Sequence, residues 1–451
     1  MTYSTRGFLS SAPLPFLILA VVWFLTTPIL GDAVETMAPQ STSRAASVPL
    51  RPLPTPTVQR LSLEEALGLF LRQNLDVIVA RYGIDFAKGQ QITARLFPNP
   101  VFGLGALGSW TQGRTLGRSG MLFPQVQQLF ELAGKRGYRI ESAEYGTKGA
   151  EAAFEDAIRK LSYTLKETYY RVQLGHRRLG LAEENRDRFA RILDINTLRF
   201  KKGFIAEVDL IRIRLQVVDF KSQVITATQE TESARADLRV LLQLPASIGL
   251  ELTSELDYRR VEPDLPWLQQ AALDSRPDLR QRRLAIAQRS ADLKLAQAYR
   301  YPDVTLGAGY SIQGTQGPDN PQQGALMVGI PLPLFNRNQG GIAQGEVGVA
   351  TADAELQKAL VEVENEVDIA YRNLLQTRTL VEAYQQGVLD DARQTFTIVE
   401  RAYERGGATI IELLDAARTA RAIQMNYLES LFSYQRNVFR LESAIGRELE
   451  M

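Results

Sequence analysis

The sequence predicts an α+β protein built from two similar halves, each with a modest helix, a hairpin of two strands and a pair of very long helices. Three observations support this fold class: short motifs that recur at a constant offset, a two-residue apolar period over the strands, and a heptad-like period over long stretches without proline. The 451 residues leave room for one large elongated body or for two or three ordinary domains.

Residues 1–33 are predicted to be a secretory signal peptide. Arg6 supplies a positive charge, and the apolar run from Phe16 to Leu25 rises only about 15 Å as a helix, half of a bilayer core. Small residues follow at Gly31 and Ala33, as at a cleavage site. The short run disfavours the alternative, a permanent single-span anchor. Residues 34–60 are rich in proline and predict an extended tether, so we expect an exported protein.

Internal repetition divides the rest of the chain. Proline and glycine positions recur at an offset of 204 residues: Pro98, Gly103 and Gly105 match Pro302, Gly307 and Gly309. Segments 200–203 and 403–406 match at an offset of 203. We therefore predict a tandem duplication, with halves over residues 61–250 and 262–451 and a proline-bearing link between them.

Each half opens with a predicted helix, over residues 62–94 and 265–299, and continues with a strand hairpin. In the second half, apolar side chains alternate with small or polar ones over 304–311 and 325–332, so each strand has one apolar face. The segment 314–321, dense in glycine and proline, predicts the turn. The first hairpin is less regular, with strands over 102–106 and 121–130.

Long helices follow both hairpins. Residues 356–374 carry apolar side chains in steps of four and three, and residues 158–172 are similarly spaced. Residues 137–200 contain no proline, and as one helix they would be about 96 Å long. Glycines at 203 and 406 predict a break, after which a second helix returns to about residue 242 or 445.

Composition excludes several classes of protein. A net charge of +1 argues against a nucleic-acid binder, which needs a clustered basic surface. The absence of cysteine excludes disulfides and thiolate metal sites, and a single histidine excludes a multi-histidine metal site. Since no nucleophile–base pair, phosphate loop or metal-ligand spacing occurs, we expect neither an enzyme nor a cofactor.

Four strands with one apolar face each raise the question of oligomerisation. An open sheet edge is unstable in lipid, and membrane barrels need at least eight strands, so the chain must oligomerise if its strands span a bilayer. The alternative is a soluble four-stranded sheet packed on helices, but the helices are already committed to heptad packing. Aromatic residues near the strand ends, such as Phe97, Trp110, Tyr301 and Phe335, favour the membrane interpretation.

Three local motifs together resemble the TolC-type outer-membrane efflux proteins. They are Leu61-Ser-Leu-Glu-Glu-Ala66, Pro98-Asn-Pro100 and Gly406-Gly-Ala-Thr-Ile-Ile-Glu-Leu-Leu-Asp415. The resemblance implies a homotrimer whose twelve strands form an outer-membrane barrel, continuous with a periplasmic barrel of helices. It also implies a passive channel in the outer-membrane lipid that completes a tripartite efflux system, with a periplasmic membrane-fusion adaptor and an inner-membrane RND-type transporter as partners.

A further motif bears on the substrate. Glu131-Leu-Ala-Gly-Lys-Arg136 resembles a motif of the heavy-metal cation-efflux group, from which Ala133 departs. The segment Pro331-Leu-Pro-Leu-Phe-Asn-Arg-Asn-Gln-Gly340 resembles the same group. We therefore expect metal cations as substrate, with drugs or secreted proteins as the alternative. Both motifs equally suit a purely structural role at a strand–helix junction.

The resemblance also implies a periplasmic gate. Glu412 and Asp415 match the acidic positions near the helical tip, three residues apart on one helix face. The alternative is that both only solvate a helix N-terminus. Tyr403 and Asp209 match a polar link that holds the tip closed, although Ala408 stands where an arginine partner is expected. Two other functions stay open: a periplasmic coiled-coil stalk without a pore, and an exported hydrolase.

Overall fold

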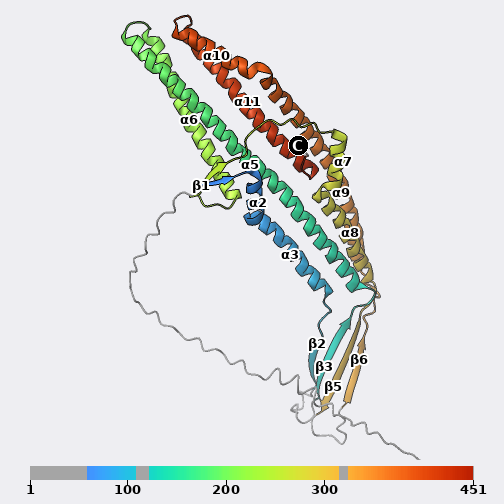
Figure 1. The fold of residues 1–451 in the computed structure, drawn as a ribbon. Helices are drawn as coiled ribbons and strands as arrows, with labels where there is room; N and C mark the ends of the chain where they lie inside the picture. Colours follow the sequence, from blue (N-terminus) through green and yellow to red (C-terminus); the bar gives the residue numbers. More distant parts are fainter. Residues whose placement is uncertain (1–57, 108–120, 314–322, 450–451) are drawn as a thin grey trace, which may run out of the picture. The chain divides into compact units, whose positions relative to one another are not determined.

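The computed structural model describes residues 58–107, 121–313 and 323–449, all within one compact unit that spans Pro54–Met451. The predicted signal peptide lies outside the described residues, as does the predicted tether up to residue 57. Figure 1 shows that the four longer strands lie at one end of the long helices.

The described part of the first half, with the end of the predicted tether, contains β1 (Val58–Leu61), α2 (Leu63–Gln73), α3 (Leu75–Arg95), β2 (Val101–Leu107), β3 (Met121–Phe130), α5 (Lys135–Lys201) and α6 (Glu207–Leu241). β4 (Gly249–Leu252) lies at the boundary between the first half and the link. The described part of the second half contains α7 (Leu265–Ser275), α8 (Pro277–Ala298), β5 (Val304–Gln313), β6 (Gln323–Gly329), α9 (Gln339–Ala383), a π-helical turn (Tyr384–Val388), α10 (Leu389–Glu404) and α11 (Ile410–Ile445). In both halves the described elements run in the order of short helices, a strand hairpin and long helices.

The opening helix of each half is broken in two, where the sequence predicted one continuous helix. Asn74 ends α2 in an extended conformation, and its side chain accepts hydrogen bonds from the backbone N–H groups of Asp76 and Val77, which starts α3. In the second half, Pro277 occupies the first turn of α8 and disfavours a helical conformation for Arg276. The breaks therefore follow from local capping and proline sterics.

A small parallel sheet joins the end of the predicted tether to the boundary between the first half and the link. β1 pairs with β4 from Val58 opposite Gly249 to Leu61 opposite Leu252. Residues 58–60, the last of the predicted tether, are thus part of a strand. The buried Tyr169 hydroxyl supports this sheet because it donates to the Leu61 carbonyl and accepts from the Ser254 N–H.

The four-stranded sheet is antiparallel, in the order β2-β3-β5-β6. One line of paired residues across it is apolar and exposed: Phe102, Val126, Ala308 and Leu326. The next line, on the opposite face, is small or polar: Gly103, Gln125, Gly309 and Ala325. The sheet therefore presents an apolar face that no described residue covers, and β2 and β6 are its two outer strands.

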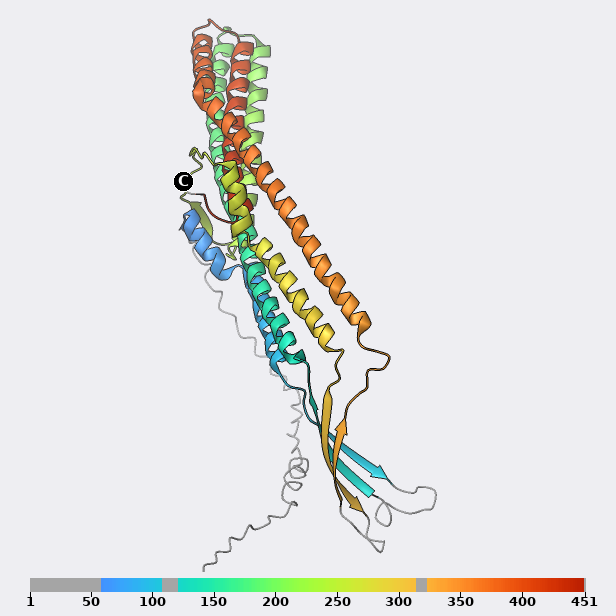
Figure 2. The ribbon, with the colours of Figure 1, turned by 90° about the vertical axis from the view of Figure 1, so that its right-hand side faces the viewer.

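The long helices pack through the predicted heptad positions. In α5, Leu165, Tyr169 and Val172 are buried, and in α9 the buried positions include Val367 and Leu374. α5 runs without interruption for 67 residues, alongside α6, α8 and α3 (Figure 2). No helix in the described part of the chain is both long and apolar enough to cross a membrane.

The counterpart of α5 in the second half is interrupted, whereas α5 is continuous. Between α9 and α10, a π-helical turn contains Gly387 at φ 122°, a conformation that favours glycine. Elsewhere, residues with positive φ occupy matching places in the two halves: Gly134 with Asn338, Gly203 with Gly406, and Gln243 with Gly446. Each pair lies at the offset of 203 or 204 residues found in the sequence.

Candidate functional site

The turns of the two long-helix pairs are held side by side. The Tyr403 hydroxyl of α10 donates to Asn196 Oδ1 of α5 at 2.8 Å, and Arg199 Nη2 donates to the Glu404 carbonyl at 2.5 Å. Behind these contacts, apolar side chains from all four helices form one buried cluster: Phe189, Ile192, Ile213, Phe220, Phe396 and Leu413. A hollow of about 610 Å³ lies between the turns, lined by Asp209, Tyr403 and Arg405 among others.

Glu412 forms a capping box at the start of α11. Its carboxylate accepts from the Thr409 N–H at 2.6 Å and from the Thr409 hydroxyl at 2.9 Å, and its own N–H donates to that hydroxyl. These hydrogen bonds lower the pKa of the Glu412 carboxyl. The exposed carboxylate is therefore ionised, but it is also occupied by a structural role.

Asp415, one turn further along α11, is exposed and makes no hydrogen bond or ion pair with the residues that the structure describes. The two acidic positions thus share an exposed helix face, as their spacing predicted. Of the two, only Asp415 is without a partner among the described residues.

Within the chain, Tyr403 and Asp209, the two residues of the predicted latch, have other partners. Asp209 pairs with Arg212 at 3.3 Å, and Tyr403 bonds to Asn196, so the expected Tyr403–Asp209 hydrogen bond is not among the described contacts. Burial raises the pKa of Tyr403, which keeps its hydroxyl a donor. The cation beside Tyr403 is Arg199, 6.0 Å from the ring centre, whereas Ala408 lines the hollow without a charge.

Sequence reasoning missed Asn196. It is buried and follows Phe189 and Ile192 in steps of three and four, so it occupies a seam position of α5. A polar residue at such a position specifies helix register through a buried hydrogen bond. That interruption of an apolar heptad pattern is the signal that would have identified it.

The motif Glu131–Arg136 forms the junction between β3 and α5. Ala133 and Gly134 both have positive φ, which turns the chain from strand to helix. Lys135 is buried, and its Nζ donates to Asp303 Oδ1 at 2.6 Å and to the Tyr301 carbonyl at 2.7 Å. These contacts join the two halves and support the structural interpretation of the motif.

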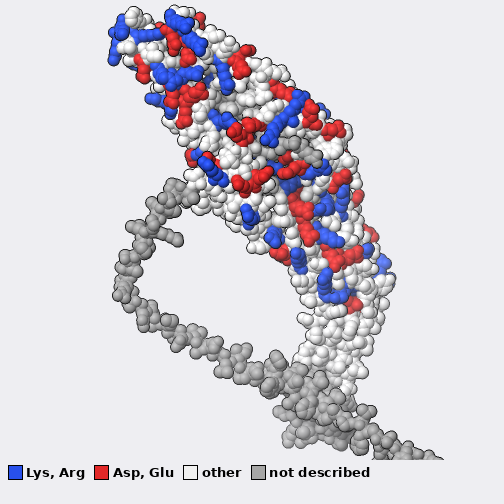
Figure 3. Space-filling model, in the orientation of Figure 1, with Lys and Arg blue, Asp and Glu red and all other residues white. Residues whose placement is uncertain are grey.

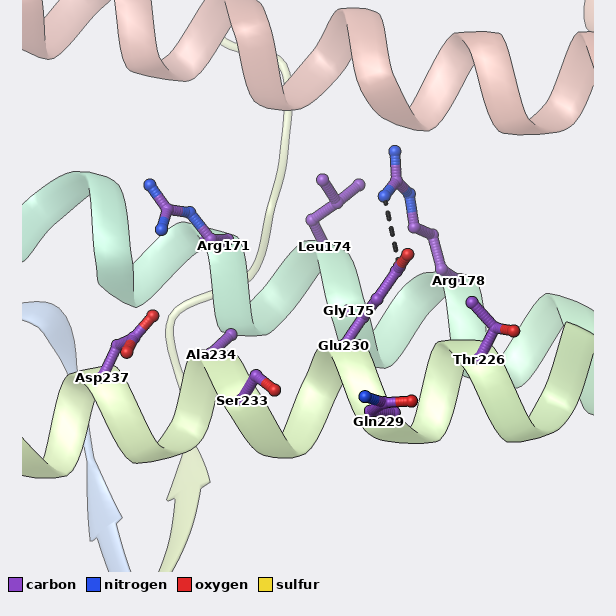
Figure 4. A pocket seen from close by; sticks show the side chains of 10 residues that line it. All are labelled: Arg171, Leu174, Gly175, Arg178, Thr226, Gln229, Glu230, Ser233, Ala234 and Asp237. Carbon is purple, nitrogen blue, oxygen red and sulfur yellow. Dashed lines mark ion pairs between the residues drawn. The ribbon is translucent and has the colours of Figure 1, made fainter.

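A second hollow, of about 480 Å³, lies between α5 and α6 (Figure 4). Two of its basic residues are held in ion pairs: Arg178 pairs with Glu230 and with Glu429 of α11, and Arg171 pairs with Glu167. No group of three or more potential metal ligands occurs among the described residues. The charges of the helical part are of both signs and mixed, while the strands present an uncharged surface (Figure 3).

Comparison with known proteins identifies the class to which this fold and site belong. The family model for outer membrane efflux proteins matches residues 66–243 and again residues 268–447. The chain therefore belongs to the outer membrane efflux protein family, whose members are channel proteins of the Gram-negative outer membrane, and the outer membrane is its location.

Individual relatives extend over nearly the whole chain. The cobalt-zinc-cadmium resistance protein CzcC of Cupriavidus metallidurans is 27% identical over 423 residues, which cover 93% of this chain and 98% of the relative. A crystal structure of CusC has a TM-score of 0.73 at 18% identity, over 91% of this chain and 99% of that one. The CmeC outer membrane channel of Campylobacter jejuni has a TM-score of 0.72 at 17% identity, over 85% of each chain.

Proposed function

We propose that three copies of the chain form the outer-membrane channel of a tripartite efflux system. Twelve strands, four from each copy, would close a barrel, and the long helices would continue it as a periplasmic tunnel. A periplasmic adaptor would dock at the helical turns, and an inner-membrane RND-type transporter would supply the energy. We also propose that the chain arose by tandem duplication. Residues with positive φ recur at matching positions, so the backbone turns at the same places in both halves.

One observation carries the proposal: the four-stranded sheet has an exposed apolar face and two outer strands without a partner among the described residues. An open edge within lipid leaves backbone groups unpaired at a cost of several kcal/mol each. Antiparallel pairing of β2 with β6 of a neighbouring copy would satisfy both edges, since four strands per copy keep the alternation of direction around a closed ring.

A disulfide scan tests this closure, and the chain offers a background free of cysteine. Leu104→Cys in β2 is combined in turn with cysteine at Gly324, Leu326 or Val328 of β6. Leu104, Leu326 and Val328 are all exposed, and alternate residues of a strand share a face. One of the three combinations is expected to give covalent trimers on a non-reducing gel after oxidation.

Matched controls place the second cysteine at Ala325 or Met327, which point to the other face of β6 and cannot reach Leu104→Cys. Covalent trimers with these pairs, or none with any pair, would contradict the β2–β6 closure.

The acidic gate is the second element of the proposal. Three-fold symmetry would gather three copies of Asp415 and of Glu412 into a cation-favouring constriction. In planar bilayers we expect Asp415→Asn to lower the permeability ratio of K⁺ to Cl⁻ and to raise conductance, because negative charge is removed while the Thr409–Glu412 cap is kept.

Glu412→Gln is the companion variant, since an amide oxygen still accepts from Thr409. Arg418→Gln, an exposed change one turn away, serves as a control of opposite sign. Unchanged selectivity in both acidic variants would remove the gate but leave the channel. Absence of pores from folded protein would favour a stalk without a pore.

We further propose that the exported substrate is a metal cation, on the strength of the relative named for cobalt, zinc and cadmium resistance. No group of three or more potential metal ligands occurs among the described residues, so in this proposal the channel favours cations without distinguishing one metal from another. Deletion of the gene is expected to raise cellular zinc and cadmium during metal exposure. Unchanged metal content together with accumulation of a drug would support the alternative substrate class.

A further inference from the structure

The helix-proximal end of the four-stranded sheet brings together residues far apart in the sequence. β2 and β5 begin at this end and β3 and β6 finish there, because neighbouring strands are antiparallel. The flanking segments 95–100, 131–137, 299–303 and 330–338 therefore lie at one level, between the apolar sheet and the charged helices (Figure 2).

These four segments contain five basic residues and two acidic ones. Both acidic residues are already engaged, since Glu131 pairs with Arg139 and Asp303 pairs with Lys135. Three cations, Arg136, Arg300 and Arg337, have no carboxylate partner among the described residues. The level thus carries an uncompensated positive charge, although the whole chain is nearly neutral.

Exposed aromatic side chains share this level. Phe97 is 70% exposed, Tyr301 60% and Phe335 91%. The guanidinium of Arg136, which is partly exposed, lies 4.2 Å from the centre of the exposed Phe97 ring and makes a cation–π contact with it. We call the three arginines and three aromatic residues the junction belt.

Arginine next to aromatic rings at the edge of an apolar surface is typical of the headgroup level of a membrane. The exposed apolar face of the sheet continues into the junction belt through the segment 331–337, where Leu332 and Leu334 are also exposed. In the proposed trimer, neighbouring copies would add further arginines of like charge at this level, and phosphate groups would neutralise them. An anionic lipid supplies both the phosphate and the acyl chains that the apolar face requires.

We propose that the junction belt binds anionic phospholipid headgroups in the periplasmic leaflet of the outer membrane and so fixes the depth of the sheet in the bilayer. This inference rests on the proposed membrane placement of the four-stranded sheet. It adds a lipid selectivity that the placement alone does not require, because an apolar sheet contacts neutral and anionic lipids alike.

Electron spin resonance with spin-labelled lipids tests the proposal on the full-length protein in phosphatidylcholine bilayers. Labelled phosphatidylglycerol is expected to be immobilised roughly fivefold more strongly than labelled phosphatidylcholine, the gain that one arginine near an anionic charge provides. The triple variant Arg136→Gln, Arg300→Gln and Arg337→Gln is expected to bring this ratio close to one. High salt is expected to lower the ratio for the unaltered protein.

A control variant removes the same charge from the helical part: Arg214→Gln, Arg401→Gln and Arg418→Gln, three exposed arginines without a carboxylate partner among the described residues. It is expected to keep the preference. Equal immobilisation of the two lipids by the unaltered protein, or an unchanged ratio in the triple variant, would overturn the proposal. Absence of any immobilised lipid with the unaltered protein would overturn the membrane placement of the sheet as well. Immobilised phosphatidylcholine with the triple variant would show that this variant is folded and inserted.

Discussion

Replacement of Lys135 by methionine is expected to lower the free energy of unfolding by about 3–5 kcal/mol, the usual effect of removing one member of a buried ion pair. The Lys135 side chain is 2% exposed, and Asp303 is 20% exposed. Without the ammonium group, the Asp303 carboxylate keeps a hydrogen bond from the Leu132 N–H but has no cation in the described contacts. Denaturant unfolding in detergent, followed by far-ultraviolet circular dichroism, measures the loss.

Two comparisons make this expectation specific. Lys294→Met removes an exposed ion pair with Glu141 and is expected to change stability by less than about 1 kcal/mol. The double variant Lys135→Met/Asp303→Leu is expected to recover most of the loss, because no isolated charge remains. A Lys135→Met loss as small as that of Lys294→Met would show that the junction does not depend on this pair.

Arg276→Met is expected to cost a similar amount, about 3–5 kcal/mol. Arg276 is 5% exposed and is bound on several sides: Nη2 pairs with Asp278 at 2.6 Å, and Nη1 pairs with Glu366 at 2.7 Å. Nη1 also donates to the Ala444 carbonyl at 2.8 Å. One guanidinium thus joins the start of α8 to α9 and to the end of α11, and its loss leaves two carboxylates close together.

Arg276→Lys separates charge from geometry at this position. An ammonium group keeps the charge but cannot make the forked contacts, so the same unfolding measurement is expected to give an intermediate loss. A lysine variant as stable as the unaltered protein would assign the effect to charge alone. A methionine variant of unchanged stability would show that Arg276 does not hold these three helices together.

The elements that the sequence predicted well are those with a local period. The heptad positions of α5 and α9 and the alternation in β5 and β6 repeat over many residues, so the pattern reports directly on the face that is buried or exposed. The helix breaks at Asn74 and Arg276 have local sequence signals, a capping asparagine and a following proline. Hydrophobic periodicity alone does not detect these signals. The pairing of β1 with β4 joins residues that are 191 positions apart in the sequence, so no local sequence pattern predicts it.

In the candidate site, too, the sequence predicted local features but not contacts between distant residues. The spacing of Glu412 and Asp415 placed them correctly on one exposed face, and the sequence Thr409-x-x-Glu412 also carried the signature of the capping box that occupies Glu412. The partners of Tyr403 and Lys135 lie 207 and 168 residues away, so only the fold identifies Asn196 and Asp303. The segment Glu131–Arg136, which resembles a motif of the heavy-metal cation-efflux group, lies at the junction of β3 and α5, where Lys135 donates to Asp303.

The kink at Gly387 makes the two halves differ in stiffness. In α5 the helical backbone hydrogen bonds are continuous over 67 residues. Bending this helix near its middle would therefore strain the hydrogen bonds of the turns before and after the bend. Between α9 and α10 the ladder is already interrupted at Gln386 and Gly387, and α10 can tilt or fray as a separate cooperative segment. We therefore expect α5 to bend less readily than its counterpart α9–α10, although both halves follow the same order of elements.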